Sequence, residues 1–296
     1  MLPEKYKRII TGNIDTLWKI WRGLGLFSDG DRLLASPEEA LFGLCVFGRY
    51  DQRLYDEAVS LLSSYPDLIY KNKISYFLRN ADETTRSVFA VLCTGFPATP
   101  SGKRMQTIIP AVKNVKQNSV VPFFLSLQHA ASFIAGKPDP TYQEYGWLRN
   151  RFHRSSNVPS LSTIATLNPW ARAKLIFGNT GRVDVILSLL QSSATAPDIA
   201  RKTGCTPKGA WNILTDLEHA GIAVSRQVQN KRVFLLSEDG RKKLSFLDPG
   251  KKAASFFEQW RELGYYLHFL GQLPEGVSRE LIVSEEIRIG EMVKGL

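Results

Sequence analysis

The chain has 296 residues, of which 44% are hydrophobic and 11% aromatic, and its formal net charge is +10. This length and apolar fraction exclude wholesale disorder, and they suffice for one large domain or for two to three smaller ones. The three cysteines, Cys45, Cys93 and Cys205, lie far apart, which excludes a disulfide framework and favours a reducing compartment.

Neither a secretory signal nor a membrane span is expected. The first ten residues lack the apolar core of a signal peptide, so we expect a cytoplasmic protein. The longest uncharged stretch, residues 117–136, contains Pro122, Gln128 and His129. These residues disfavour a bilayer-spanning helix, and the stretch is interpreted as a buried helix with a polar entry.

The excess of basic residues lies in the middle of the chain. Residues 84–138 carry six Lys/Arg and no Asp/Glu, and residues 139–183 carry six against two. Residues 184–252 have a net charge of +4, whereas the two ends are neutral to acidic. Clustered Lys and Arg residues favour a polyanionic partner, because they displace the counterions held by a phosphate backbone. A solubilising surface has a similar composition, so charge alone does not decide between the two.

The first half of the chain predicts helices. Apolar residues recur at helical spacing over residues 14–24, and Ser36, Pro37 and Glu39 make a capping box with proline in the first helical position. Further helices are expected over residues 51–65 and 83–93, with apolar and aromatic stripes that favour a packed core over a ligand pocket.

A break rich in Pro, Gly and Ser is expected at residues 95–103, and another turn at residues 136–140. The segment 147–154 then interleaves Arg149, Arg151 and Arg154 with aromatic residues, which suits either base stacking or the end of an amphipathic helix. Residues 158–167 are interpreted as a loop, and a new compact unit is expected from Pro169.

Residues 182–240 carry the sharpest pattern. Two helices are predicted, over residues 183–190 and 197–203. Gly204 ends the second helix in the left-handed conformation, and Thr206 caps a third.

The third helix has an apolar stripe made of Ala210, Ile213, Leu214 and Leu217. Gly221 ends it, and two strand-like runs follow at residues 223–228 and 232–236, joined by Gln229-Asn230-Lys231. Because asparagine tolerates the positive φ of a tight turn, these runs predict a two-stranded wing.

This order of elements resembles a winged helix-turn-helix, most closely that of the MarR/ArsR-like bacterial regulators. The resemblance covers about a fifth of the chain and is carried by Asp198-Ile199-Ala200-Arg201, Leu217-Glu218-His219-Ala220-Gly221-Ile222 and Ser237-Glu238-Asp239-Gly240-Arg241. It implies a DNA-binding transcriptional regulator whose third helix enters the major groove. Such regulators are commonly dimers.

The candidate contacts to double-stranded DNA are the residues of the third helix that lie outside its buried stripe, together with residues of the wing. These are Thr206, Lys208, Trp211, Asn212, Thr215, Arg226, Gln229, Asn230, Lys231 and Arg232. Asn212 suits adenine, Lys208 suits guanine or phosphate, and the wing suits the minor groove or backbone. Helices that read DNA often carry several basic residues, whereas this one has only Lys208 and also carries Asp216 and Glu218. The alternative is therefore a protein-interaction adaptor, with an antitoxin-like role, whose winged helix binds protein.

The sequence therefore predicts a mainly α fold in three parts. Residues 1–168 form a helical N-terminal region with a sub-boundary near 95–103, residues 169–247 form the winged helix-turn-helix, and residues 248–296 form a helical tail. The N-terminal region is expected to bind a protein or small-molecule effector or to mediate assembly. The apolar stripe of the tail either packs on the N-terminal half or pairs two subunits.

No enzyme signature emerges. Gly95 to Arg104 lacks the spacing and the Ser/Thr of a phosphate-binding loop, and the four histidines lie apart from the cysteines and from each other. We therefore expect no catalytic residues, no metal site and no cofactor.

Overall fold

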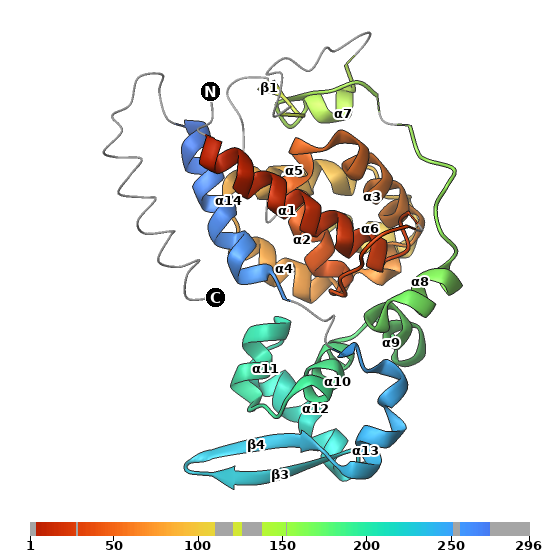
Figure 1. Ribbon diagram of the computed structural model, residues 1–296, viewed down its shortest axis with the longest axis vertical. Coiled ribbons are helices and arrows are strands. Elements are labelled where there is room, and N and C mark those ends of the chain that lie inside the picture. Colours follow the sequence, from red (N-terminus) through yellow and green to blue (C-terminus); the bar gives the residue numbers. More distant parts are fainter. Residues whose placement is uncertain are drawn as a thin grey trace.

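The computed structural model describes residues 4–27, 29–109, 121–125, 138–151, 153–250 and 255–272. The protein is mainly helical, with two small two-stranded sheets in these ranges. Figure 1 shows two lobes, a larger helical one and a smaller one from which a long hairpin projects. None of the described helices combines the length and the apolarity needed to cross a bilayer.

The larger lobe contains most helices of the first half and the last helix of the described chain. Its α-helices are α1 (Glu4–Gly23), α2 (Pro37–Phe47), α3 (Gln52–Ser64), α4 (Lys71–Arg79), α5 (Glu83–Thr94), α6 (Pro100–Gln106), α7 (Pro140–Gln143) and α14 (Phe257–Gln272). Two 3-10 turns, η1 (Gly48–Tyr50) and η2 (Pro66–Leu68), and the strands β1 (Val121–Pro122) and β2 (Trp147–Leu148) complete it. Every residue of α2 is buried, which places this helix at the centre of the lobe.

The helix starts predicted from local sequence are confirmed. The Ser36 hydroxyl accepts a hydrogen bond from the Glu39 amide, and the Glu39 carboxylate bonds back to Ser36 to complete the capping box of α2. At α3 the Asp51 carboxylate accepts the amide hydrogen bond of Leu54 at 2.9 Å, without a reciprocal bond. These caps satisfy amide groups that a helix leaves unpaired at its first turn.

Two local predictions are wrong. The helix expected over residues 117–136 is replaced at Val121–Pro122 by β1, which pairs in parallel with β2, while residues 117–120 and 126–136 lie outside the described residues. The loop expected over residues 158–167 contains helix α8 (Leu161–Leu167), which Ser160 caps. Its threonines and isoleucine are weak helix formers, so burial of Ile164 and the cap outweigh local preference.

The predicted break at residues 95–103 ends at Thr99, whose hydroxyl caps α6. Cys93 before the break and Met105 after it belong to one hydrophobic core, so the chain crosses this point without leaving the core. Of the turn expected at residues 136–140, residues 136 and 137 lie outside the described residues. Asp139 accepts the amide hydrogen bond of Thr141 and caps α7.

The apolar stripe of α14 packs on the larger lobe. Trp260 is fully buried, stacks on Phe256 and donates a hydrogen bond of 2.8 Å from its indole Nε1 to Asn13 of α1. Gly43 of α2 makes room for this tryptophan, since a Cβ there would lie 2.2 Å from the ring. The described part of the predicted tail, residues 255–272, therefore packs on the N-terminal half, while residues 251–254 and 273–296 lie outside the described residues.

The smaller lobe has its own hydrophobic core. It is built from α9 (Pro169–Phe177), α10 (Gly181–Gln191), α11 (Ala196–Thr203), α12 (Pro207–His219), α13 (Glu238–Lys243), the 3-10 turn η4 (Ser245–Leu247) and the strands β3 (Ala223–Val228) and β4 (Lys231–Leu236). The strands form an antiparallel hairpin in which Ala223 pairs with Leu236 and Val228 with Lys231. The positive φ of its turn falls on Gln229 (53°), one residue before the asparagine expected to supply it.

A cluster of buried charges joins the two lobes. Lys174 of α9 binds Glu38 of α2, and Lys73 of α4 binds Asp184 of α10 with 2.6 Å between Nζ and Oδ1. Lys73 also lies 4.0 Å from the second oxygen of Glu38. All four side chains are at most 5% exposed, so each charge depends on its partners for compensation.

These partners determine the protonation of the cluster. Burial alone would raise the pKa of Glu38, but Lys174 and Lys73 outweigh it and hold that pKa below its usual value. Burial raises the pKa of Asp184 despite the neighbouring Lys73, and Asp184 and Glu38 in turn raise the pKa of Lys73 above its usual value. The two carboxylates of the cluster therefore have pKa values shifted in opposite directions.

Removing one of these charges is predicted to destabilise the protein strongly. Asp184→Asn keeps the side-chain shape but leaves Lys73 without its nearest buried counter-charge, which we expect to lower the free energy of unfolding by about 3–5 kcal/mol. Urea unfolding followed by circular dichroism measures this loss.

The matched control is Asp239→Asn, which breaks an ion pair with Lys243 whose side chains are both 63% exposed. That change should cost no more than about 1 kcal/mol. Equal effects of the two substitutions would show that the buried cluster does not hold the lobes together.

Candidate nucleic-acid interface

Helix α12 is positioned by its first residues and by an apolar stripe. The Thr206 hydroxyl accepts the amide hydrogen bond of Gly209 at 3.0 Å, and Gly204 before it adopts the left-handed conformation with φ of 70°. Ala210, Leu214 and Leu217 are buried against the rest of the smaller lobe. This leaves one side of the helix facing solvent.

The predicted contact residues of α12 fall into three environments. Thr206, Lys208 and Asn212 are exposed, although the Thr206 hydroxyl is already used by the cap. Thr215 is half-buried, and its hydroxyl oxygen has no hydrogen-bond partner in the described part of the chain. Trp211 is 39% exposed and packs edge-on against the buried ring of Phe234 in β4.

Arg232 of β4 connects the hairpin to α12 through hydrogen bonds. Its guanidinium donates to Glu218 of α12 and to Ser225 of β3, at 2.6 and 2.8 Å, and lies 5.2 Å from the centre of the Trp211 ring. Ser225 also donates to Glu218 at 2.6 Å. These hydrogen bonds, together with the charge of Arg232, lower the pKa of Glu218 and keep it ionised. Arg232 and Trp211 are therefore occupied within the lobe.

The remaining hairpin residues named from the sequence stand at or near its tip. Arg226, Gln229, Asn230 and Lys231 are all exposed. Among the described residues, neither Arg226 nor Lys231 has an acidic partner within ion-pair distance. Val224 and Val228, on the same strand face as Arg226, are also exposed, at 45% and 44%.

The start of α12 faces the larger lobe. A Cβ on Gly204 would lie 2.9 Å from the Cβ of Tyr76, and one on Gly181, at the start of α10, would lie 2.6 Å from the Cys205 sulfur. Burial raises the pKa of Cys205, which disfavours its thiolate. The turn between α11 and α12 is thus packed closely against α4.

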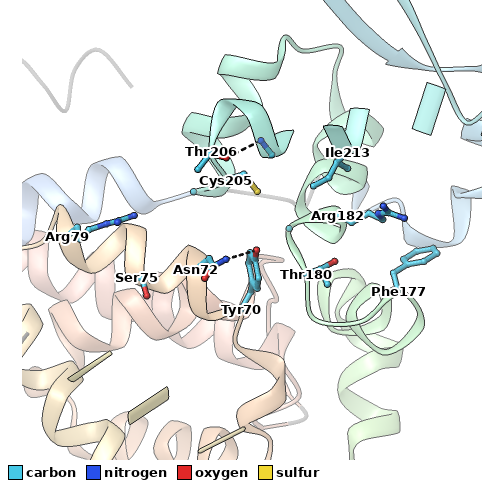
Figure 2. Close-up of a pocket in the computed structure, with 13 residues that line it drawn as sticks. Tyr70, Asn72, Ser75, Arg79, Phe177, Thr180, Arg182, Cys205, Thr206 and Ile213 are labelled. Atoms are coloured by element: carbon cyan, nitrogen blue, oxygen red, sulfur yellow. Dashed lines mark hydrogen bonds between the residues drawn. The ribbon is translucent and has the colours of Figure 1, made fainter. Parts of the chain in front are cut away.

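A cleft opens beside this turn, between α4 and the starts of α10 and α12 (Figure 2). Its lining includes Tyr70, Asn72 and Arg79 from the larger lobe, none of which the sequence singled out. These residues come from a plain amphipathic helix and the turn before it. No motif marks them, because the cleft exists only once the two lobes meet.

The basic cluster at Arg149, Arg151 and Arg154 is not one surface. Arg149 is 3% exposed, binds Asp56 at 2.9 Å and is enclosed by aromatic rings of which Tyr142 is the nearest. Arg151 is exposed, and Arg154 donates to the Gly95 carbonyl. Three further bases of the middle segment, Lys113, Lys116 and Lys137, lie outside the described residues.

No family model, curated protein or solved structure matches this chain. Within the described residues, no three His, Cys, Asp or Glu side chains gather as metal ligands would.

The hydrogen bonds of Arg232 are expected to slow the opening of the hairpin. Arg232→Ala removes both hydrogen bonds and the stacking on Trp211, so we expect faster amide hydrogen exchange along β3 and β4 than in the unchanged protein. Hydrogen exchange followed by mass spectrometry measures this. Lys231→Ala, one residue away and exposed, is the control and should leave the exchange rates of the hairpin unchanged. Unaltered exchange in Arg232→Ala would refute the anchoring role.

Proposed function

We propose that α10, α11, α12 and the β3–β4 hairpin act as a winged helix-turn-helix that binds double-stranded DNA, and that the protein is a transcriptional regulator. The observation that carries this proposal is the exposed polar surface of Lys208 and Asn212 on α12 together with Arg226 and Lys231 on the hairpin. When a cation without an acidic partner binds a phosphate, counterions are released and no ion pair within the protein has to break.

Within this proposal the residues divide into contacts and supports. Asn212 has the donor and acceptor pair that reads adenine in the major groove, and Lys208 lies one turn before it. Arg226 and Lys231 suit the adjacent backbone or minor groove. Arg232 and Trp211 hold the hairpin against α12, so their contribution to DNA binding is to fix the distance between helix and wing.

The anchoring of the hairpin adds a second support. Ala194, between α10 and α11, exchanges two backbone hydrogen bonds with Phe234 of β4, of 3.0 and 2.9 Å. The hairpin is therefore attached to the connection between α10 and α11 as well as to α12. A rigid wing loses little conformational freedom when it binds, which favours affinity.

A protein-binding role is the second candidate, and one surface favours it. The outward face of the hairpin exposes Val224 and Val228 beside Arg226, an arrangement that also suits the edge or face of a partner protein. The larger lobe would then serve as the scaffold of an adaptor. Duplex binding separates the two candidates.

We predict that the protein binds duplex DNA at low salt and that its affinity falls steeply as salt rises. Asn212→Ala should reduce the discrimination between preferred and random sequences by about 1–3 kcal/mol. Lys231→Ala should weaken binding to all sequences alike and lower the slope of log K against log salt by about 1. Fluorescence anisotropy of labelled duplexes across a salt series measures both effects.

Lys19→Ala, on α1 in the larger lobe, is the control and should bind as the unchanged protein does. Absent binding at low salt, or binding without salt dependence, would reject the regulator and favour the adaptor. Identical effects of Asn212→Ala and Lys231→Ala would show that α12 does not read bases.

A further inference from the structure

The exposed side of α12 has a different neighbour on each flank. The side that carries Trp211 and Glu218 contacts the hairpin. Another side lines the cleft beside the larger lobe, with Thr206, Gly209 and Ile213. Lys208 and Asn212 are exposed between these two sides, about a quarter to a third of a turn from each at 3.6 residues per turn. The hairpin therefore stands on one flank of the exposed side, and the larger lobe stands on the other.

A duplex that receives α12 has a sugar–phosphate backbone on both flanks of the helix. The major groove of B-DNA is about 12 Å wide, close to the diameter of an α-helix with its side chains, so the two strands border the helix on either side. The hairpin stands on the flank of one strand. The element that the larger lobe places beside α12 stands on the flank of the other strand, and this element is α4.

Helix α4 lies directly against the turn that precedes α12. A Cβ on Gly204 of that turn would lie 2.9 Å from the Cβ of Tyr76. Asn72 comes one helical turn before Tyr76 and Arg79 about one turn after it, so the three side chains share one face of α4. Both Asn72 and Arg79 are exposed and line the cleft, and Figure 2 shows them across it from Thr206.

This face of α4 has the chemistry of a phosphate contact. The helix contains three basic residues and no acidic one. Arg79 has no acidic partner within ion-pair distance among the described residues, so no ion pair has to break when it binds a phosphate. Asn72 donates one N–H to the Tyr70 hydroxyl at 3.1 Å, which leaves the second N–H of its amide to donate. Arg182 also lines the cleft, but it is paired with Asp216 at 2.8 Å and is not counted among the contacts.

A buried ion pair holds α4 in place relative to the smaller lobe. Lys73 of α4 binds Asp184 of α10 at 2.6 Å, and both side chains are at most 5% exposed. Lys73 directly follows Asn72 in the chain, so the exposed face of α4 is fixed beside α12 by the same helix that carries the buried charge. A surface that is already in position loses little conformational freedom when it binds.

We propose that the exposed face of α4, with Asn72 and Arg79, extends the DNA-binding surface of α12 and binds the sugar–phosphate backbone on the side opposite the hairpin. This inference rests on the proposed DNA binding and adds a second lobe to it. Phosphate contacts carry no base information, so α4 contributes affinity and fixes the register of α12 in the groove. The larger lobe is then part of the DNA-binding surface itself.

Arg79→Gln in the full chain tests this contact. The change keeps a polar side chain but removes the charge, so binding to preferred and random duplexes should weaken by about tenfold at low salt. The slope of log K against log salt should fall by about 1. Fluorescence anisotropy of labelled duplexes across a salt series measures both effects.

The matched control is Lys71→Gln, which removes one positive charge from the same helix. The Lys71 ammonium donates to the Thr107 hydroxyl of the larger lobe at 2.6 Å. The control should bind duplex DNA within a factor of two of the unchanged protein, with the same salt slope. Circular dichroism checks that each variant is folded.

Hydroxyl-radical footprinting on a duplex of preferred sequence shows where the contact lies. Arg79→Gln should lose backbone protection at one edge of the footprint, and Lys231→Ala, at the hairpin tip, should lose it at the opposite edge. Loss at the same edge in both variants would overturn the proposal, because α4 and the hairpin would not flank α12 on the duplex.

The proposal is also overturned if folded Arg79→Gln binds duplex DNA as the unchanged protein does, or binds it more tightly, which would show that α4 obstructs the duplex. If Asn212→Ala and Lys231→Ala weaken binding while Arg79→Gln does not, this extension fails and the proposed function stands. If the unchanged protein does not bind duplex DNA at low salt, both are rejected.

Discussion

Four buried charges determine how the protein is assembled. Glu38 and Lys73 come from the larger lobe, Lys174 and Asp184 from the smaller, and each is almost wholly removed from water. A buried ion pair adds little net stability compared with apolar packing, but leaving one partner alone is expensive. The cluster therefore acts mainly as a constraint on geometry, because a displacement of the lobes by a few ångströms would leave several charges buried and unpaired. Helices α4, α9 and α10 are thus held in one arrangement.

That arrangement determines which parts of the smaller lobe are accessible. The turn between α11 and α12 packs on Tyr76 of α4. Thr206, Gly209 and Ile213 therefore face the cleft, whereas Lys208 and Asn212 on the same helix are exposed. Arg232 then connects α12 to the hairpin. We infer that the exposed face of α12 and the hairpin tip are available to a partner, whereas the turn before α12 is held against α4.

The features that were predicted correctly depend on neighbouring residues. The capping box at Ser36 and the left-handed Gly204 arise within a single turn of chain, where the identities of a few side chains decide the conformation. The predictions that failed depend on distant partners. Arg149 belongs to a basic run in sequence, yet Asp56 and Tyr142 bury it, and the pairing of Lys73 with Asp184 spans 111 residues without a local signal. The number of basic residues in a segment therefore does not predict how many of them lie at the surface.

The proposed nucleic-acid contact surface consists of α12 and the β3–β4 hairpin. Hydrogen exchange of the full chain with and without a saturating amount of low-salt duplex DNA tests it most directly. We expect added protection in residues 207–219 and 223–236, with α1, α5 and α14 unchanged. Protection confined to the larger lobe, or none at all, would contradict it.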